Sequence, residues 1–403
     1  MVITYTGKPL SELVVKICID HDKNHLLFIV TYDIINYNLK AGDDMKKIIL
    51  ILLCCAMLVV TVSCNSKNDI AEQGDGNIDT SNSEDVNVDN IDPIHYSNME
   101  FYSNGDGTCS VGSIGLADIY DAVIPQESPS GDIVTGLKCG IYTNPYVVRV
   151  TIPNTVTKIY SQAFAGMDSL KEVIIPDSVT EIGWSAFEGL TCMESIVIPG
   201  SVKTIGEKAF KDCTNLKSVT FSDGIQEIGK LSFCYCVNLK SIEIPDSVTN
   251  IGYGAFGDCT SLENVVLSNN ITVISSYAFY NCVKMNNIVI PDTVTTIGAY
   301  AFQFCESVDS IVIPNGVSEI EVLTFAHCKS LISITIPKSV KTIQERAFAE
   351  CDNLSNIYFE GTIEEWNSID KKEDWDRSYL NSEWVMSNVT IYCSDGQIIY
   401  SAT

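Results

Sequence analysis

The sequence predicts a β-rich solenoid in which nine 23-residue coils stack between residues 150 and 358. Two columns of residues predict it. Phenylalanine recurs every 23 residues from Phe164 to Phe348, and a leucine, methionine or valine does so from Leu170 to Leu354. Such a period is typical of stacked repeats, because one coil cannot bury its apolar face alone and neighbouring coils share a core.

One unit, Leu239 to Cys259, accounts for each element of the coil. Ile242 and Ile244 alternate with polar residues, which predicts a short strand with one face inward. Pro245 ends that strand, since proline donates no ladder hydrogen bond. Val248 and Ile251 return to the core, Gly252 allows a turn, and Ala255 and Phe256 fill the interior. The coil is therefore expected to be strand, turn, second apolar segment and aromatic filler.

The unit reads L-x-x-I-x-I-P-x-x-V-x-x-I-G-x-x-A-F-x-x-C and closely resembles the BspA-like family of bacterial leucine-rich repeats. The resemblance covers about half of the chain and implies a right-handed coil stack with a cap at each end. Gly105 to Cys109 with Val123 to Pro125 resembles the family's N-terminal module, placed at 95–149. Gly361 to Trp366 with Val389 to Gly396 resembles its closing cap, placed at 359–403. Open ends of a solenoid need such caps.

Ahead of the repeats, residues 45–63 have the plan of a secretory signal peptide. Met45 and two lysines precede an apolar run that is short for a membrane span, and Cys64 follows Ser63. This resembles a lipobox and implies lipidation at Cys64. Thr61 stands where leucine is usual, so ordinary cleavage or retention as an anchor stays open. Residues 64–94 are acidic and polar, which predicts a disordered tether.

The 44 residues before Met45 are unexpected, because a signal peptide belongs at the start of a protein. Codons that fit Ala41 to Met45 can contain a bacterial ribosome-binding sequence at the usual distance from a start codon. Residues 1–44 are therefore either untranslated, with Met45 as the true start, or a genuine extension. The nucleotide sequence distinguishes the two.

Charge and composition exclude several function classes. The chain has 51 acidic and 25 basic residues and a formal charge of −26, without a basic run, so nucleic acid is not an expected partner. Only four histidines occur, which disfavours a histidine-based triad or zinc site. Asn104 to Thr108 lacks the glutamate of a calcium loop and is expected to be a tight turn. No enzyme activity, cofactor or metal is predicted.

Seven cysteines repeat every 23 residues from Cys213 to Cys351. One thiol per coil forms a file without Cys-x-x-Cys pairs, so reduced structural thiols are predicted in place of a metal array or disulfide ladder. His327 precedes Cys328, but neighbours on a turn should point apart. If disulfides form, the better candidates are the cysteines outside the file, which are Cys109, Cys139, Cys192, Cys234 and Cys393.

The predicted binding face consists of outward residues along the strand row, which vary from coil to coil while core positions do not. They are Lys171, Glu172, Ile174, Lys217, Lys240, Glu243, Glu263, Val266, Asn286, Val289, Asp309, Val312, Thr335 and Tyr358. Variation fits a binding surface and an unconstrained solvated surface equally. The apolar members fit either an interaction site or lateral packing of β-branched residues along the sheet.

Together these features predict a non-catalytic protein of the bacterial cell envelope, held to the membrane by a lipid and exposed at the surface. Adhesion or recognition of an extracellular or host-surface protein is the expected function. The alternatives are a glycan-binding protein, for which Trp184, Tyr253, Tyr277, Tyr280 and Tyr300 are candidates, or the targeting module of a surface hydrolase.

Overall fold

The computed structural model describes residues 15–20, 25–30, 99–114, 120–138, 146–380, 383–386 and 388–400. The chain divides into two compact units, Met1–Val86 and Asn87–Thr403. In the first unit, β1 (Val15–Asp20) and β2 (His25–Val30) form an antiparallel pair. The predicted signal peptide, Cys64 and the tether lie outside the described residues. None of the described helices is long and apolar enough to cross a membrane.

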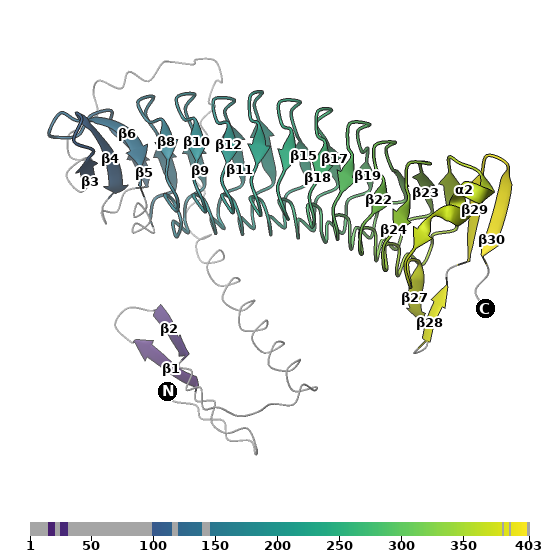
Figure 1. Ribbon diagram of the computed structural model, residues 1–403. Helices are drawn as coiled ribbons and strands as arrows, with labels where there is room; N and C mark the ends of the chain where they lie inside the picture. Colours follow the sequence, from purple (N-terminus) through teal and green to yellow (C-terminus); the bar gives the residue numbers. More distant parts are fainter. Residues whose placement is uncertain are drawn as a thin grey trace, which may run out of the picture. The chain divides into compact units, whose positions relative to one another are not determined.

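The second unit is a stack of coils with two rows of short strands, one on each side (Figure 1). The first row runs β5 (Asp121–Val123), β7 (Arg149–Thr151), β9 (Glu172–Ile174), β11 (Ser195–Ile198), β13 (Ser218–Phe221), β15 (Ser241–Glu243), β17 (Asn264–Val266), β19 (Asn287–Ile288), β21 (Ser310–Val312), β23 (Ser333–Ile336), β25 (Asn356–Phe359), β29 (Val389–Cys393) and β30 (Gly396–Tyr400). Within the repeats the pairing is parallel, and partners are 23 residues apart.

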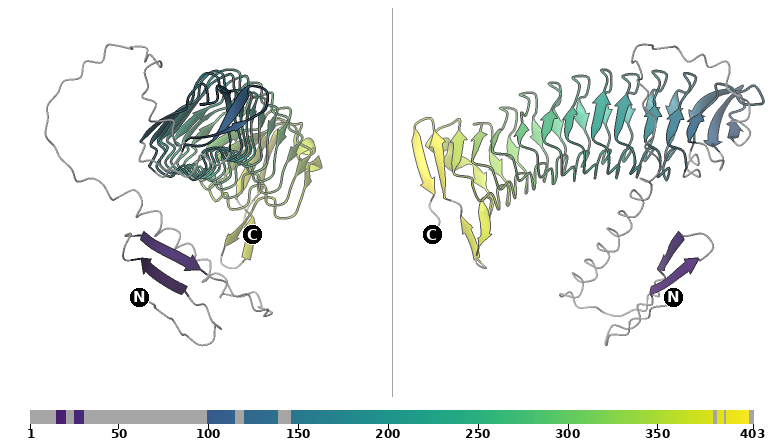
Figure 2. Two further views of the ribbon diagram at one scale, coloured as in Figure 1. Left: turned by 90° about the vertical axis from the view of Figure 1, so that its left-hand side faces the viewer. Right: turned by 180° about the vertical axis from the view of Figure 1, so that it is seen from behind.

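The second row forms where the chain returns after the turn. It runs β3 (Glu100–Ser103), β4 (Thr108–Ser113), β6 (Ile133–Leu137), β8 (Lys158–Ile159), β10 (Glu181–Ile182), β12 (Thr204–Ile205), β14 (Glu227–Ile228), β16 (Asn250–Ile251), β18 (Val273–Ile274), β20 (Thr296–Ile297), β22 (Glu319–Ile320), β24 (Thr342–Ile343) and β26 (Asp370–Lys371). Figure 2 shows both rows from the β3 end and from behind. The predicted solenoid with its 23-residue period is confirmed.

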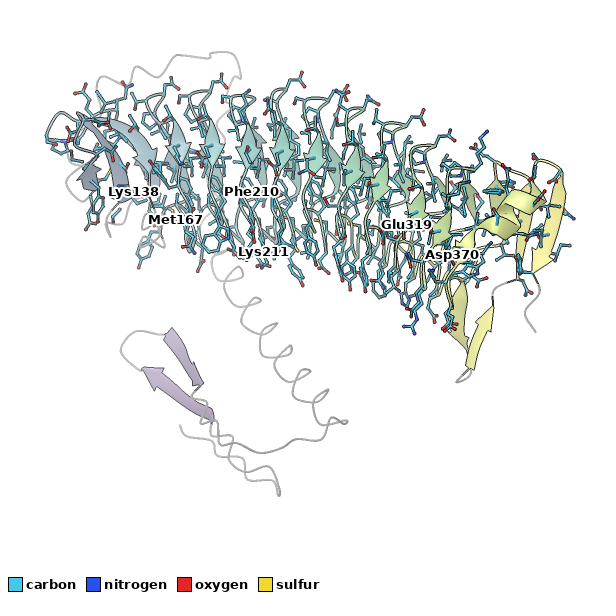
Figure 3. All side chains as sticks on the ribbon, in the orientation of Figure 1. Lys138, Met167, Phe210, Lys211, Glu319 and Asp370 are labelled. Carbon is cyan, nitrogen blue, oxygen red and sulfur yellow. The ribbon has the colours of Figure 1, made fainter. Side chains whose placement is uncertain are left out.

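The core is a stack of phenylalanine rings. All nine, from Phe164 to Phe348, are fully buried. Consecutive rings lie parallel, with centroids 4.8 Å apart between Phe164 and Phe187 and 5.6 Å apart between Phe325 and Phe348. Side chains, Phe210 among them, are drawn along the stack in Figure 3. Each inner ring, from Phe187 to Phe325, therefore has a parallel ring on both faces, which explains the strict period in the sequence.

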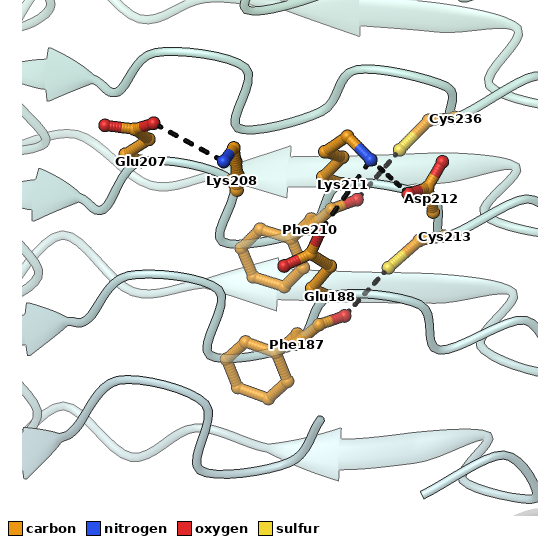
Figure 4. A network of polar contacts seen from close by, with 9 residues as sticks. All are labelled: Phe187, Glu188, Glu207, Lys208, Phe210, Lys211, Asp212, Cys213 and Cys236. Carbon is orange, nitrogen blue, oxygen red and sulfur yellow. Dashed lines mark hydrogen bonds and ion pairs between the residues drawn. The ribbon is translucent and has the colours of Figure 1, made fainter. Parts of the chain in front are cut away.

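The segment of each coil that carries the phenylalanine and the cysteine is called the strap here, for example residues 252–262. In the strap the file cysteines are fully buried. Each thiol donates to the carbonyl oxygen of a phenylalanine one coil earlier, as Cys213 does to Phe187 at 3.1 Å and Cys236 to Phe210 at 3.3 Å (Figure 4). Burial raises the pKa of Cys213 to about 12. The prediction of free structural thiols holds for these seven cysteines.

The repeated glycine has a second role beside the expected one. Gly252 is not in the left-handed region, and its lack of a side chain matters because coils approach closely there. A Cβ on Gly252 would lie 2.6 Å from the amide nitrogen of Lys230, and one on Gly206 would lie 2.6 Å from the carbonyl carbon of Gly183. The turn expected at Gly252 is present, because the Gly252 carbonyl oxygen accepts from the Ala255 amide at 3.1 Å, and the close contact between backbones is an additional constraint.

Non-glycine residues take the left-handed conformation in the strap of most coils. One series, immediately before the Ala-Phe position, includes Lys208 with φ 58°, Leu231 with φ 54° and Tyr277 with φ 61°. The amide of Lys208 donates to the carbonyl oxygen of Lys230 in the next coil at 2.8 Å. Positive φ is costly for residues with a Cβ. Here it aims the strap amides at the following coil and builds a third ladder of hydrogen bonds.

The two ends of the stack are closed by different elements. At the N-terminal end β3 and β4 form a hairpin whose turn is held by Asp106, which accepts from the Thr108 amide at 3.0 Å, so the expected tight turn is confirmed. At the C-terminal end α2 (Ile363–Ser368) has a capping box between Thr362 and Glu365. Its Trp366 is fully buried. A hairpin of β27 (Arg377–Leu380) and β28 (Glu383–Met386) follows.

Candidate binding face

The outward side of the first strand row carries an aliphatic column, defined by Ile174, Val197, Val266, Val289 and Val312. Strand register aligns Val197 with Thr220, Val266 with Glu243, and Val312 with Thr335 and Tyr358, and the 23-residue spacing gives Ile174 and Val289 the same position in their coils. Val289 is 81% exposed, and the other four are 52–62% exposed. Tyr358 stacks on Tyr392 of the cap at 5.2 Å. Packing of these aliphatic residues against their neighbours in adjacent strands therefore leaves more than half of each one exposed to solvent.

A second outward column contains only serine and asparagine over eight coils. Register aligns its members in the two sheets that make up this part of the row. They are Ser195, Ser218, Ser241, Asn264, Asn287, Ser310, Ser333 and Asn356. Outward positions were expected to vary, and these do not. Small polar side chains beside the aliphatic column make a surface of low relief, and the 23-residue spacing of serine and asparagine is a signal that sequence reasoning missed.

Most charged residues of the predicted face lie at the start of a strand or just before it, whereas Glu243 ends β15 and pairs with Val266. Lys217 pairs with Glu194 at 2.7 Å, and Arg149 pairs with Glu172 at 2.8 Å. The Lys217 ammonium lowers the pKa of Glu194. Such exposed pairs contribute little to stability. They hold long side chains at the edge of the sheet and leave the serine and asparagine column and the run Val266, Val289 and Val312 exposed.

The predicted face residues occupy one side of the stack. Lys171, Glu172, Ile174, Lys217, Lys240, Glu243, Val266, Asn286, Val289, Asp309, Val312 and Tyr358 are exposed, whereas Glu263 and Thr335 are half-buried. Sequence reasoning thus placed them at the surface. Whether this surface binds anything stays a prediction.

A hollow of about 690 Å³ interrupts the face between β13 and β17. Its lining includes Ser218, Thr220 and Phe221 of β13, Ser241 and Glu243 of β15, Val266 of β17, and the turn residues Asp223, Asp246 and Asn269. Two coils that flank β15 depart from the repeat here, because Ser222 and Ser268 replace the proline. That departure was visible in the sequence, but the hollow was not predicted from it.

The turn after β13 is held in an unusual path by two glycines. Gly224 has φ 122°, and a Cβ added there would lie 2.3 Å from the carbonyl oxygen of Gly200. The Lys203 ammonium donates to the carbonyl oxygens of Gly200 at 3.1 Å and of Gly224 at 3.2 Å. Asp223, which belongs to this turn, is thereby set at the edge of the hollow.

Aromatic side chains gather on the strap, away from the first strand row. Tyr277 contacts Tyr253 at 5.1 Å and stacks on Tyr300 at 4.5 Å, and Tyr280 lies 5.4 Å from Tyr277. Lys230 lies over the Tyr253 ring at 5.7 Å. The sequence shows no regular alignment of these tyrosines because Tyr253 and Tyr277 occupy adjacent positions of the 23-residue repeat. Tyr277 and Tyr300 cover each other by stacking, whereas Tyr253 and Trp184 are each 42% exposed.

No group of three or more histidine, cysteine, aspartate or glutamate side chains in the described part of the chain could hold a metal ion. His327 stacks on Phe304 at 4.3 Å, whereas the adjacent Cys328 thiol donates to the Phe302 carbonyl at 3.3 Å. The two side chains point apart, as expected. Burial lowers the pKa of His327.

These features define a leucine-rich-repeat solenoid with an open strand face. The model of the BspA-type leucine-rich repeat region matches residues 137–263, 180–306 and 249–369, together more than half of the chain. The chain therefore belongs to the BspA-type leucine-rich repeat family. Among curated proteins, none matches it.

Solved structures that resemble the chain are also leucine-rich-repeat proteins. One, a leucine-rich repeat protein from Bacteroides ovatus, is 28% identical with a TM-score of 0.59, over 65% of this chain and 70% of that one. A leucine-rich cell surface protein from Faecalibacterium prausnitzii is 25% identical with a TM-score of 0.37, over 68% of this chain and 96% of that one. The first supports the fold described above.

Proposed function

We propose that the protein is a non-catalytic, lipid-anchored component of a bacterial cell surface that recognises an extracellular protein through its first strand row. The observation that carries the proposal is the serine and asparagine column over eight coils, which lies beside an unbroken aliphatic run of Val266, Val289 and Val312 that is 56–81% exposed. A contiguous exposed apolar stripe of this kind marks interaction sites. Contacts repeated over several coils can add, although each is weak.

A protein partner is favoured over a glycan by the geometry of the aromatic residues. Sugar rings stack on exposed aromatic faces, whereas Tyr277 has rings against it on both sides and Tyr253 lies between Tyr277 and Lys230. Val289 and Val312 instead present aliphatic area suited to protein side chains.

Adhesion of bacteria that carry the full chain to epithelial cell monolayers tests the face. We expect Val289→Ser/Val312→Ser to reduce adhesion strongly, because it removes exposed aliphatic area from the column. The matched control Tyr235→Ser/Tyr253→Ser removes exposed aromatic area from the strap and should leave adhesion unchanged. Protease treatment of the monolayer should abolish adhesion, and glycosidase treatment should not. The opposite pattern in variants and treatments would support the glycan alternative.

The anchor is tested separately. Wild-type protein should be recovered from the membrane fraction as a chain that begins at Cys64 and releases fatty acid on hydrolysis. Cys64→Ser should pass to the soluble fraction without lipid. Recovery of Cys64→Ser in the membrane with an unchanged mass would contradict lipidation and leave the strand face as the remaining part of the proposal.

A further inference from the structure

The hollow between β13 and β17 differs from the rest of the strand face in its charge. Asp223, Glu243 and Asp246 all line it, and all three are exposed. No lysine, arginine or histidine is part of the lining. None of the ion pairs found among the described residues involves these three carboxylates. Elsewhere on the face, acids such as Glu194 are paired with lysine.

One of the carboxylates has a defined orientation. Asp246 Oδ1 accepts from the amide of Asn269 at 2.8 Å and from its Nδ2 at 3.2 Å, across two neighbouring coils. The Asn270 side chain donates to the Asp246 carbonyl at 2.8 Å. Because Lys203 fixes the turn that carries Asp223, both rim acids are attached to ordered turns and not to a loose loop.

The apolar groups beside the hollow continue the aliphatic column. Val266 lines it directly, and Val289 and Val312 follow along the row. An occupant would therefore meet carboxylates at one end and aliphatic side chains at the other. A volume of about 690 Å³ leaves room for a lysine or arginine side chain.

A second copy of this chain is a poor occupant. Face-to-face packing would oppose a net charge of −26 to the same charge. Such packing would also place the Glu243 carboxylate of one copy against the aliphatic column or a carboxylate of the other. Like charges that meet at an interface disfavour association.

Resting on the proposed function of the face, we propose that the hollow is the recognition site for a basic polypeptide segment. A lysine or arginine side chain of the partner enters it between Asp223, Glu243 and Asp246. Neighbouring aliphatic side chains of the same extended segment lie on Val266, Val289 and Val312. The partner class is thus a protein with a basic, extended segment; charge selects it and the aliphatic column retains it.

Fluorescence anisotropy with the full chain tests the proposal. The probe is a labelled peptide Val-Ser-Lys-Ser-Val-Ser-Val-Ser, and its partner probe has glutamate in place of lysine. We expect the lysine peptide to bind with a Kd below about 1 mM, and binding to weaken as salt rises from about 0.05 to about 0.3 M. The glutamate peptide should not bind.

Asp223→Asn/Glu243→Gln/Asp246→Asn should weaken the lysine peptide about tenfold, since three exposed charge pairs each contribute modestly. The matched control Asp168→Asn/Glu360→Gln/Glu373→Gln removes three exposed acids elsewhere and should change Kd less than about twofold. Circular dichroism verifies that both variants are folded.

Equal binding of the two peptides, no binding of the lysine peptide, or an unchanged Kd in the hollow variant would overturn the proposal. If that happens while Val289→Ser/Val312→Ser still loses cell adhesion, the face is a binding surface and only the basic partner is wrong. If adhesion is unaffected as well, the proposed function of the face fails with it.

Discussion

The two sides of each coil use one 23-residue period for opposite purposes. On the strap, Phe256 and Cys259 are fully buried; the Phe256 ring stacks on Phe233 one coil earlier, and the Cys259 thiol donates to the Phe233 carbonyl oxygen. On the strand face, Val266, Val289 and Val312 follow the same period over three coils, but Val266 and Val289 are 56% and 81% exposed. A period therefore does not by itself distinguish residues that build the stack from residues that are free to serve another purpose. Substitutions distinguish the two groups, because only replacement of a buried residue should lower the free energy of unfolding.

The largest effect is expected at the phenylalanine stack. Phe256 is fully buried, with ring centroids 5.5 Å from Phe233 and 5.7 Å from Phe279. Phe256→Ala should lower the free energy of unfolding by about 3–5 kcal/mol, because it opens a cavity between two rings. Urea titration followed by circular dichroism measures it. A loss below about 1 kcal/mol would show that neighbouring coils collapse to fill the space.

A smaller loss is expected at the close approach of coils. In Gly206→Ala the new Cβ would meet the backbone of Gly183, which cannot move without disturbing the second strand row. We expect about 1–3 kcal/mol of destabilisation, as for other overpacked sites. Ser275→Ala, at the same column in a coil without the glycine, serves as control and should be nearly neutral in thermal unfolding.

The buried cysteine thiols of the strap predict that the stability of the fold depends on pH. Burial raises the pKa of Cys213 from its ordinary value of 9.0 to about 12. The folded state therefore holds this proton more tightly than the unfolded state. The stability that it contributes is fully present below about pH 9 and is lost as pH rises from about 9 towards 12.

Cys213→Ala should remove part of this dependence. Between about pH 8 and pH 10 the wild-type protein should lose about 1 kcal/mol more than the variant, on top of losses shared with the other file cysteines. Urea titrations at several pH values measure the difference. Parallel pH profiles for the two proteins would contradict a buried, protonated Cys213.

The smallest stability effect is expected on the strand face. Val289→Ser/Val312→Ser should change the free energy of unfolding by less than about 0.5 kcal/mol per site, because both side chains are already in solvent. The same variant is expected to lose adhesion. A large stability loss in thermal unfolding would place these valines among the residues that build the stack.

The regular part of the fold was predictable because each buried column leaves a residue-type constraint. Phe164 to Phe348 and Cys213 to Cys351 must each fit the same space in every coil, so their period appears in one sequence without an alignment. The strand face could be located because exposed residues alternate with buried ones along each strand, as Val289 does with the buried Ile288 and Ile290.

The contacts between coils were not predictable to the same extent. The Tyr253, Tyr277 and Tyr300 cluster joins two columns that differ by one position. The role of Gly252 depends on how near the preceding backbone comes. Neither can be inferred from spacing, because spacing gives the order of residues along a coil and not the distance between coils.

By itself, the sequence determined the repeat, its apolar interior, the free thiols of the strap and the side of the coil that faces solvent, since each follows from which residue types a buried position tolerates. Only the tertiary structure decided where the face is hollowed and which acids meet there. Asp223, Glu243 and Asp246 come from two coils and are brought together by a turn whose path depends on Gly200 and Gly224 in contact. A pattern read along one chain cannot specify such a meeting, because it is a property of how successive coils pack.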